Sequence, residues 1–367
     1  MEQTILTASE DYKELDQWFL NNEISKILLV CDGSLQYLNI NGYFKNLKNV
    51  IVVKFDDFQP NPLYESVVRG VEVFRKEMCD GIIAVGGGSA LDVAKCIKLY
   101  SNMNPAENYL KQEIVPNNIP FLAVPTTAGT GSEATRYAVI YYEGAKQSVT
   151  DNSIIPSSVL MDASSLKTLP LYQKKSTMMD ALCHAIESFW SVNSNDESKK
   201  YSRQAIEMIL ANMDQYLSND EKANAAMLKA AHISGKAINI TQTTAGHAMC
   251  YKLTSLYGIA HGHAAALVDT KLFPFMIGNI EKCIDHRGEA YLRETFQQIA
   301  NAMGCRTPEE AAEKLQAVFD SLELRKPEPE EADFEELRNS VNPVRLRNNP
   351  IELDIETIDG LYHQILG

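Results

Sequence analysis

The sequence of 367 residues predicts two domains, an α/β domain over residues 1–162 and an all-helical domain over residues 163–367. Two observations support this prediction. Up to about residue 162, short apolar runs alternate with helix-like segments, which is typical of buried parallel strands in an α/β sheet. Beyond that point the strand signals stop and helical periodicity dominates. The length also favours two domains, because single hydrophobic cores stop growing near ~250–300 residues.

Four short apolar runs predict the strands of the first domain, at residues 27–30, 50–53, 81–85 and 120–125. Helix-like segments accompany them, over residues 11–20, up to about residue 78 and over residues 91–100. Ligands of such sheets bind at the carboxyl ends of the strands. Asp32 follows the first run and three glycines follow the third. This edge of the sheet is therefore the expected ligand site.

The second domain is expected to be helical from residue 171 onward. Its clearest helical patterns are at residues 202–213, 223–238 and 290–303. A charged linker with two prolines, residues 326–331, precedes a last helical region.

The net charge of −14 and the lack of a basic block argue against nucleic acid or an anionic membrane as a partner. A small anionic substrate stays compatible, because a pocket can be locally positive on an acidic protein. Seven scattered cysteines without a C-x-x-C pair favour reduced thiols and a cytoplasmic location. The first residues show no secretory signal, and no apolar stretch approaches the ~20 residues of a membrane span.

The turn Gly86-Gly87-Gly88-Ser89 lies between an expected strand and an expected helix. Its bare backbone can approach a phosphate while the amides at the helix N-terminus point at it. Ser89 is expected to cap the helix, and Asp92 to complete a capping-box-like first turn. The alternative is a tight turn without a ligand. Three consecutive glycines cost conformational entropy, which favours the phosphate role.

Residues 129–134 match the pattern G-x-G-x-x-A of dinucleotide-binding folds. The match does not follow a first strand, and residues 137–142 after it favour a strand where the pattern requires a helix. We therefore interpret residues 125–133 as a hydroxyl-rich loop over a cofactor. Asp32 is placed to bind ribose hydroxyls and would repel a 2′-phosphate, which favours NAD over NADP. Asp32 is equally well interpreted as an exposed aspartate in the turn before Gly33, without a ligand.

Asp180 and His184 are four residues apart, so on a helix they project from the same face. His247 and His261 each lie among small residues, which let another helix or a ligand come close. One carboxylate and three imidazoles suit Fe(II) or Zn(II) better than calcium. With one open position, such an ion polarises a carbonyl. The alternative is that these are ordinary core and surface groups, since the Asp180–His184 spacing is common by chance.

Four segments in this order resemble the iron-containing (group III) alcohol dehydrogenase family over nearly the whole chain: residues 86–95, 125–133, 180–187 and 261–263. The resemblance implies a dinucleotide-binding domain, a helical domain, a cleft between them and commonly a homodimer, on the fold shared with dehydroquinate synthase. It assigns metal ligation to Asp180, His184, His247 and His261. It assigns cofactor contacts to Asp32, Asn61, Gly87, Gly88, Ser89, Thr126, Thr127, Thr130 and Lys146. The glycine turn adds Gly86 and Asp92.

Two departures from the family pattern concern the pocket. Many members have a second histidine four residues after the third ligand, where this chain has Tyr251. Proton delivery by Tyr251, by a water chain or by ribose hydroxyls stays open. Residues 176–179 also replace a small Ala-Thr-Gly stretch, which changes the expected pocket floor.

Residues 246–264 and 340–350 resemble the branch that reduces phosphonoacetaldehyde to 2-hydroxyethylphosphonate. A phosphonate dianion needs cationic donors beside the metal. Lys252, Arg136 and Arg345 are candidates, although a solvated surface charge is the more common fate of a lone Lys or Arg. His263 is expected either to line the same pocket or to pack.

The expected function is a metal-dependent aldehyde reductase that uses NAD(H) rather than NADP(H), with Fe(II) or Zn(II). A general short-chain alcohol or diol dehydrogenase is the alternative within the family. A cyclising lyase of the dehydroquinate synthase type, which uses NAD only transiently, is an alternative from another reaction class. The aspartate among the ligands favours the dehydrogenases. A non-catalytic binding protein is the third reading, and the intact set of four ligands argues against it.

Overall fold

The structure, a computed structural model, describes residues 3–367, which form two compact units. The first unit consists of the chain up to Thr127, Gly131–Leu169 and Asn219–Leu228. The second consists of Ala128–Thr130, Pro170–Ser218 and Lys229–Gly367. The expected domain boundary between residues 162 and 163 stays a prediction.

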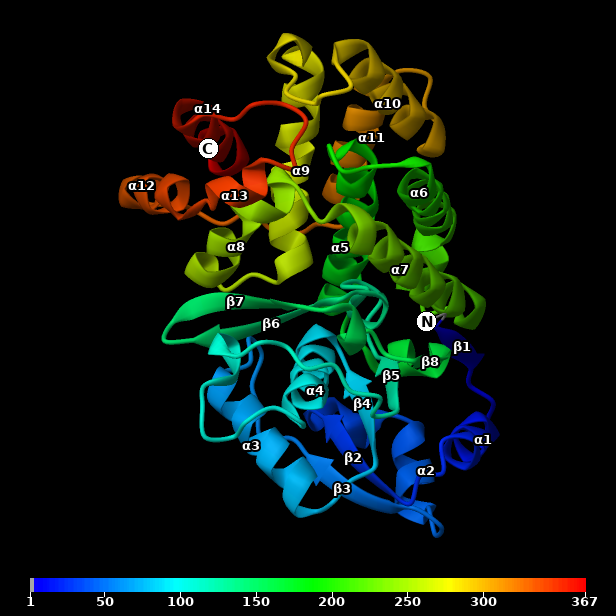
Figure 1. Cartoon of the computed structure of the whole chain (residues 1–367). Helices are drawn as coiled ribbons and strands as arrows, with labels where there is room; N and C mark the ends of the chain where they lie inside the picture. Colours follow the sequence, from blue (N-terminus) through cyan, green and yellow to red (C-terminus); the bar gives the residue numbers. More distant parts are fainter. Residues whose placement is uncertain (1–2) are drawn as a thin grey trace. The chain divides into compact units, whose positions relative to one another are not determined.

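A six-stranded parallel sheet forms the centre of the first unit, in the order β1-β8-β5-β4-β2-β3 (Figure 1). Its strands are β1 (Thr4–Thr7), β2 (Lys26–Cys31), β3 (Ile51–Phe55), β4 (Gly81–Gly86), β5 (Phe121–Pro125) and β8 (Ser158–Met161). The four strands expected from apolar runs are thus confirmed. β1 and β8 were not expected, because each is only four residues long and β1 is largely exposed at the edge of the sheet.

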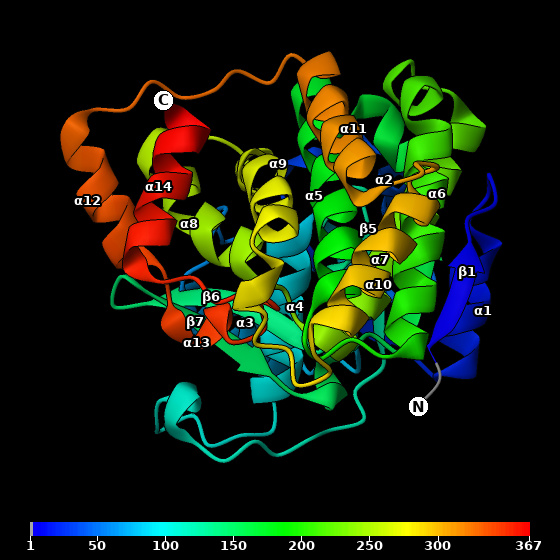
Figure 2. The same cartoon turned by 90° about the horizontal axis from the view of Figure 1, so that it is seen from above.

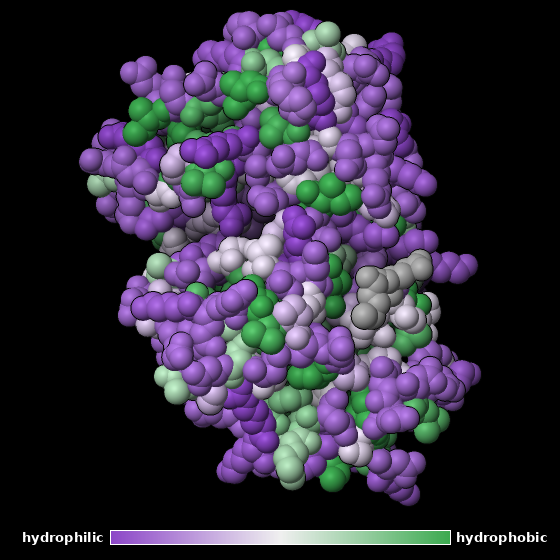
Figure 3. All heavy atoms as spheres, in the orientation of Figure 1, coloured by the Kyte–Doolittle hydropathy of each residue, from purple (hydrophilic) through white to green (hydrophobic). Residues whose placement is uncertain are grey.

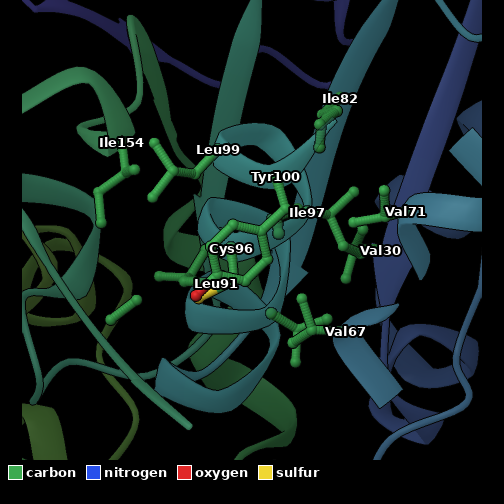
Figure 4. Close-up of a cluster of buried hydrophobic side chains, with 14 of the residues drawn as sticks. Val30, Val67, Val71, Ile82, Leu91, Cys96, Ile97, Leu99, Tyr100 and Ile154 are labelled. Atoms are coloured by element: carbon green, nitrogen blue, oxygen red, sulfur yellow. The ribbon is translucent and has the colours of Figure 1, made fainter. Parts of the chain in front are cut away.

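Helices cover both faces of this sheet, which explains why its strands are apolar on both sides. Leu28 and Val30 of β2 belong to one core cluster, with residues of α3 (Tyr64–Lys76) and α4 (Gly88–Tyr100). Figure 4 shows this cluster around Val30, Val67, Val71 and Ile97. Ile27 and Leu29 belong to a second cluster, with residues of α1 (Lys13–Asn21) and α2 (Ile40–Asn46). The α/β architecture predicted from the sequence is confirmed.

A two-stranded antiparallel hairpin, β6 (Tyr137–Tyr142) and β7 (Ala145–Thr150), follows the hydroxyl-rich loop. The strand expected at residues 137–142 is therefore confirmed. Lys95 of α4 is fully buried beneath this segment and donates hydrogen bonds to Ser132 Oγ (2.9 Å), Thr135 Oγ1 (3.2 Å) and the Tyr137 carbonyl (2.7 Å). These bonds fix α4 to the loop and the hairpin.

Asp92, one turn earlier on α4, completes the same buried network. Its carboxylate accepts hydrogen bonds from Ser132 Oγ (2.7 Å) and from the Val139 amide (2.9 Å). Burial lowers the pKa of Lys95 to about 8, against the attraction of the Asp92 and Glu133 carboxylates. The two charges therefore depend on each other for their place in the core.

The second unit is helical, as predicted. Its helices are α5 (Leu171–Trp190), α6 (Asp196–Leu217), α7 (Glu221–Thr241, whose first residues belong to the first unit), α8 (Ala245–Tyr257), α9 (His261–Gly278), α10 (Glu289–Ala302), α11 (Pro308–Ser321), α12 (Glu331–Ser340), α13 (Pro343–Leu346) and α14 (Ile355–Leu366). α5 is the central helix, packed against α6, α9 and α10 (Figure 2). Every residue of α5 from position 178 to 190 is buried, as expected for a helix surrounded by others.

Hydrophilic residues predominate on the face shown in Figure 3, and hydrophobic ones are scattered among them. Within residues 3–367, none of the helices combines the length and the apolar character that a membrane crossing requires.

Replacing Lys95 by methionine keeps the side-chain length but removes its charged donor. The Asp92 carboxylate then stays buried without its cation, so the free energy of unfolding should fall by about 3–5 kcal/mol. Urea denaturation of the coenzyme-free protein measures this change. Lys54→Met is the control, because Lys54 forms an exposed ion pair with Asp56 and its loss should cost less than ~1 kcal/mol. Equal losses in the two variants would contradict the structural role of Lys95.

Candidate functional site

The glycine turn joins the carboxyl end of β4 to the start of α4, as expected. The helix begins at Gly88, with Gly87 as its N-cap and no side-chain capping bond. The expected cap by Ser89 and the capping box with Asp92 are therefore wrong. The helix starts before Ser89, and the Asp92 carboxylate is already used by Ser132 and by a backbone amide of β6. The amides of the first turn have no capping side chain and can face a bound anion.

A cavity of about 450 Å³ opens at this turn, between the carboxyl ends of β2, β3 and β4. It is lined by Asp32, Gly33, Ser34, Asp56, Phe58, Gln59, Pro60, Gly87, Gly88 and Ser89. The cavity combines helix N-terminal amides, carboxylates and an aromatic ring. Such a lining can hold the phosphates and a ribose of a nucleotide.

Asp32 lies where two cavities meet, since it also lines a neighbouring one of about 400 Å³. Its Oδ1 accepts a hydrogen bond of 2.8 Å from the Ser34 amide and caps a short 3-10 helix. Asp32 therefore both stabilises a turn and lines a cavity that can receive a ligand. Gly86 lies close by, and a Cβ there would come within 2.6 Å of Ala90 Cβ, so only glycine fits.

The other expected cofactor residues lie outside the lining of this cavity. Thr126 is buried and Thr127 lies against the glycine turn, where a Cβ on Gly87 would be 3.3 Å from its methyl group. Asn61 has a left-handed backbone with φ of 58°, which asparagine tolerates. Lys146 is on β7, and Thr130 belongs to the second unit. Their cofactor contacts stay predictions.

Three of the four expected metal ligands converge in the second unit. Single donor atoms of Asp180, His247 and His261 all lie within 4.8 Å of one another, and His247 Nε2 is 3.4 Å from Asp180 Oδ1. His184, the fourth, is outside this group, but its ring stacks on that of His247 at 4.3 Å between centroids. Its buried Nδ1 has no hydrogen-bond partner among the described residues. Asp180 and His247 are buried and His261 is half-buried, so the cluster is open on the His261 side.

Glu187 is a buried carboxylate of the cluster that the sequence analysis missed. One of its carboxylate oxygens is hydrogen-bonded to His247 Nδ1. The other accepts from the Thr244 amide at 2.6 Å and from the Thr244 hydroxyl at 2.7 Å. With Nδ1 donating to Glu187, His247 turns Nε2 toward Asp180. Glu187 is seven residues after Asp180 on α5, so the shared helix face was a signal that could have identified it.

The charges in the cluster depend on one another. Burial by itself would lower the pKa of His247, but the Glu187 and Asp180 carboxylates raise this pKa to about 10. Burial likewise opposes ionisation of Asp180, but the nearby imidazoles of His184, His247 and His261 hold its pKa well below the ordinary range. Burial lowers the pKa of His184 to about 4, so this imidazole stays neutral near pH 7. The centre of the cluster therefore favours a positive charge.

Two glycines permit this convergence, which confirms the expectation that small residues allow close approach. A Cβ on Gly262 would lie 2.1 Å from the Ser176 carbonyl oxygen and 2.5 Å from Asp180 Cβ. A Cβ on Gly246 would lie 1.9 Å from Asp269 Oδ1. Contacts of that length do not occur, so α8 and α9 reach the cluster only because these positions are glycine.

Tyr251 occupies the open side of the cluster. Its ring lies nearly parallel to that of His261, with centroids 5.3 Å apart and planes at 17°. Its hydroxyl accepts a hydrogen bond of 3.1 Å from Arg345 Nη1. Burial raises the pKa of Tyr251, so the phenol stays protonated at neutral pH.

The remaining expected pocket residues have other partners. Lys252 forms an ion pair with Glu336 of α12. His263 is buried, and its Nδ1 lies 3.2 Å from the Tyr172 hydroxyl. Arg136 belongs to the first unit, where its Nε donates to a tyrosine hydroxyl at 3.1 Å. The pocket roles of these three residues stay predictions.

Comparison with known families gives two matches that together span nearly the whole chain. The family described as "Iron-containing alcohol dehydrogenase" matches residues 3–163. The family described as "Fe-containing alcohol dehydrogenase family, C-terminal" matches residues 174–366.

Among curated proteins, the chain is similar to the phosphonoacetaldehyde reductase of Streptomyces viridochromogenes, with 30% identity over 312 residues, 81% of this chain and 79% of the relative. It is 35% identical over 272 residues to the 1,3-propanediol dehydrogenase of Citrobacter freundii, covering 71% and 70% of the two chains.

Among solved structures, the sulfoacetaldehyde reductase of Bifidobacterium kashiwanohense in complex with NAD+ superposes with a TM-score of 0.87 at 25% identity, covering 100% of this chain and 97% of the other. An iron-containing alcohol dehydrogenase of Thermococcus thioreducens gives a TM-score of 0.89 at 20% identity, covering 100% and 98%, and supports the fold alone.

Gly262→Ala should destabilise the protein, because the new methyl group meets backbone and Asp180 atoms that cannot yield. We expect a loss of about 1–3 kcal/mol in unfolding free energy, the usual cost of overpacking. Gly360→Ala on α14 is the matched control. Nothing lies within 4 Å of its Cβ position, so the gain in helix propensity should stabilise by about 0.5–1 kcal/mol. Thermal unfolding of both variants measures the two effects, and a stabilised Gly262→Ala protein would contradict the packing described here.

Proposed function

The chain belongs to the iron-containing alcohol dehydrogenase family, and from this premise we propose that it reduces phosphonoacetaldehyde to 2-hydroxyethylphosphonate with NADH. The main observation in support of this chemistry is the convergence of Asp180, His247 and His261 on one point. Residues 1–162 would hold the coenzyme and residues 163–367 the metal. We further propose a cytoplasmic homodimer, for which the scattered cysteines without a C-x-x-C pair and the family resemblance are the support.

Asp180, His184, His247 and His261 are the proposed metal ligands. One carboxylate with imidazoles is a donor set for Fe(II) or Zn(II), and supply decides between two ions that accept the same shell. The raised pKa of His247 fits a cation at the centre of the cluster. A bound ion would supply Lewis-acid polarisation of the aldehyde carbonyl, while NADH supplies the hydride.

Glu187 is the proposed positioning residue of this site. By accepting the Nδ1 proton it fixes the tautomer of His247 and leaves the Nε2 lone pair for the ion. Its second oxygen is held by both donors of Thr244, so the carboxylate cannot rotate away.

The coenzyme would bind along the glycine turn, with its phosphates at the amides of Gly87, Gly88 and Ser89. Asp32 at the rim of the cavity would accept hydrogen bonds from the adenosine ribose and disfavour a 2′-phosphate, which favours NAD over NADP. The NAD+ complex of the similar sulfoacetaldehyde reductase supports this preference.

Two similarities support an anionic two-carbon aldehyde as substrate. The relative from Streptomyces viridochromogenes is a phosphonoacetaldehyde reductase, and the structure from Bifidobacterium kashiwanohense is a sulfoacetaldehyde reductase. Both compounds carry a tetrahedral oxyanion one methylene from the aldehyde. The similarity to a 1,3-propanediol dehydrogenase favours a second candidate, a general alcohol or diol dehydrogenase.

The substrate proposal is tested by kcat/KM for phosphonoacetaldehyde, acetaldehyde and butyraldehyde, with anaerobically Fe(II)-loaded enzyme and NADH absorbance as the signal. We expect a preference of about 100-fold or more for the phosphonate, equivalent to about 2.7 kcal/mol of transition-state binding. Equal values on all three aldehydes would favour the general dehydrogenase. Absence of net NADH consumption with any aldehyde would favour the lyase.

Metal binding is tested with Asp180→Ala and Glu187→Gln. Loss of the ligand in Asp180→Ala should abolish both Zn(II) retention and turnover in a folded protein. Glu187→Gln should weaken Zn(II) affinity by about 10- to 100-fold, because His247 loses the partner that orients it. Metal competition titration measures the Zn(II) affinities, and circular dichroism checks that each variant is folded. Glu336→Gln is the control, since this exposed carboxylate pairs with Lys252 and its loss should leave metal affinity unchanged. Wild-type affinity in Asp180→Ala would refute the site.

A further inference from the structure

The open side of the metal-ligand cluster carries a stack of three side chains from three helices. His261 begins α9, Tyr251 lies on α8, and Arg345 lies on α13, which packs against α8 (Figure 1). The Tyr251 ring lies on the His261 ring, and the guanidinium carbon of Arg345 is 5.3 Å from the centre of the Tyr251 ring. Arg345 is thus one aromatic ring away from a proposed metal ligand.

Arg345 differs from the neighbouring cationic side chains because no carboxylate among residues 3–367 pairs with it. Lys252, the next residue on α8, is paired with Glu336, and Arg338 of α12 is paired with Asp359. Within residues 3–367, Arg345 makes no ion pair, and its hydrogen-bond partner is the Tyr251 hydroxyl. An uncompensated, half-buried guanidinium is unusual in a chain with a net charge of −14. Its remaining donors are suited to an anion that arrives from solution.

We propose that Arg345 and the Tyr251 hydroxyl form a subsite for the tetrahedral oxyanion of the substrate, beside the metal ligands. This inference rests on the proposed function and assigns its anion specificity to these two residues. The guanidinium binds two oxyanion oxygens as a fork, and the Tyr251 hydroxyl, which accepts from Arg345, donates its own proton to a third. Phosphonate and sulfonate share this chemistry.

The size of the substrate agrees with this position. In phosphonoacetaldehyde and sulfoacetaldehyde a single methylene separates the aldehyde carbon from the oxyanion. When the aldehyde carbonyl faces the metal-ligand cluster, the oxyanion must lie close to that cluster, at a distance that a single side chain can span. Arg345 meets this condition through Tyr251, whereas Lys252 is held by Glu336.

The test compares Arg345→Gln with the wild type on phosphonoacetaldehyde, sulfoacetaldehyde and neutral propionaldehyde. We expect kcat/KM for both anionic aldehydes to fall by about 100-fold, mainly through KM, and that for propionaldehyde to change by less than about 3-fold. Arg345→Lys should restore part of the loss, since it returns the charge without the fork. Arg347→Gln is the matched control, because Arg347 is exposed at the end of the same helix. The wild-type ratio of the two anionic substrates identifies phosphonate or sulfonate as the preferred group.

A binding measurement separates the subsite from turnover. Calorimetric titration with 2-hydroxyethylphosphonate, in the presence of NAD+, should show weaker binding to Arg345→Gln and Tyr251→Phe than to Arg347→Gln. Equal losses on propionaldehyde and on the anionic aldehydes would overturn the inference and leave Arg345 as a support for Tyr251. A wild type that prefers phosphonoacetaldehyde, with Arg345→Gln keeping that preference, would also overturn it. A wild type without any preference would instead refute the proposed substrate.

Discussion

The helical unit depends on the close approach of α8 and α9 to α5. Gly246 and Gly262 set this distance, because a single added methyl group would meet atoms at about 2 Å. The approach buries the carboxylates of Asp180 and Glu187. Each isolated buried charge costs several kcal/mol, so both need a cationic partner. The His247 imidazole lies between them and supplies it when protonated. A site whose packing imposes two carboxylates on one imidazole is predisposed to accept a metal cation in place of the proton.

The segment of residues 86–95 serves two purposes in the first unit. Its glycines end β4 and begin α4 with uncapped amides at the cavity, which is the arrangement that binds an anion. Asp92 and Lys95 project to the other side and hold the loop and the hairpin by buried hydrogen bonds. The backbone of the glycine turn is thereby fixed by buried polar groups. A turn of three glycines is flexible by itself, so its geometry comes from this support.

The sequence alone predicted local structure well. It predicted that residues distant along the chain meet at one site only through the resemblance to a known family. Continuous apolar runs predicted the central strands, because strands covered on both faces lack polar alternation. The four-residue spacing of Asp180 and His184 predicted a shared helix face, but nothing local links that pair to His247 or His261. The capping box failed because Asp92 bonds to residues 40 or more positions away, a contact no local pattern contains. Glu187 lies seven residues after Asp180, so helix periodicity alone places it on the same face of α5.

Tyr251 connects the chemistry of the site to its selectivity. Many family members have a histidine at this position, which can exchange a proton near pH 7. Burial raises the pKa of the Tyr251 phenol above its ordinary value, so the phenol keeps its proton near pH 7. What the phenol offers instead is a flat ring against His261 and a hydroxyl that Arg345 orients. With the subsite proposed above, the exchange of histidine for tyrosine replaces a proton donor by an anion-binding group.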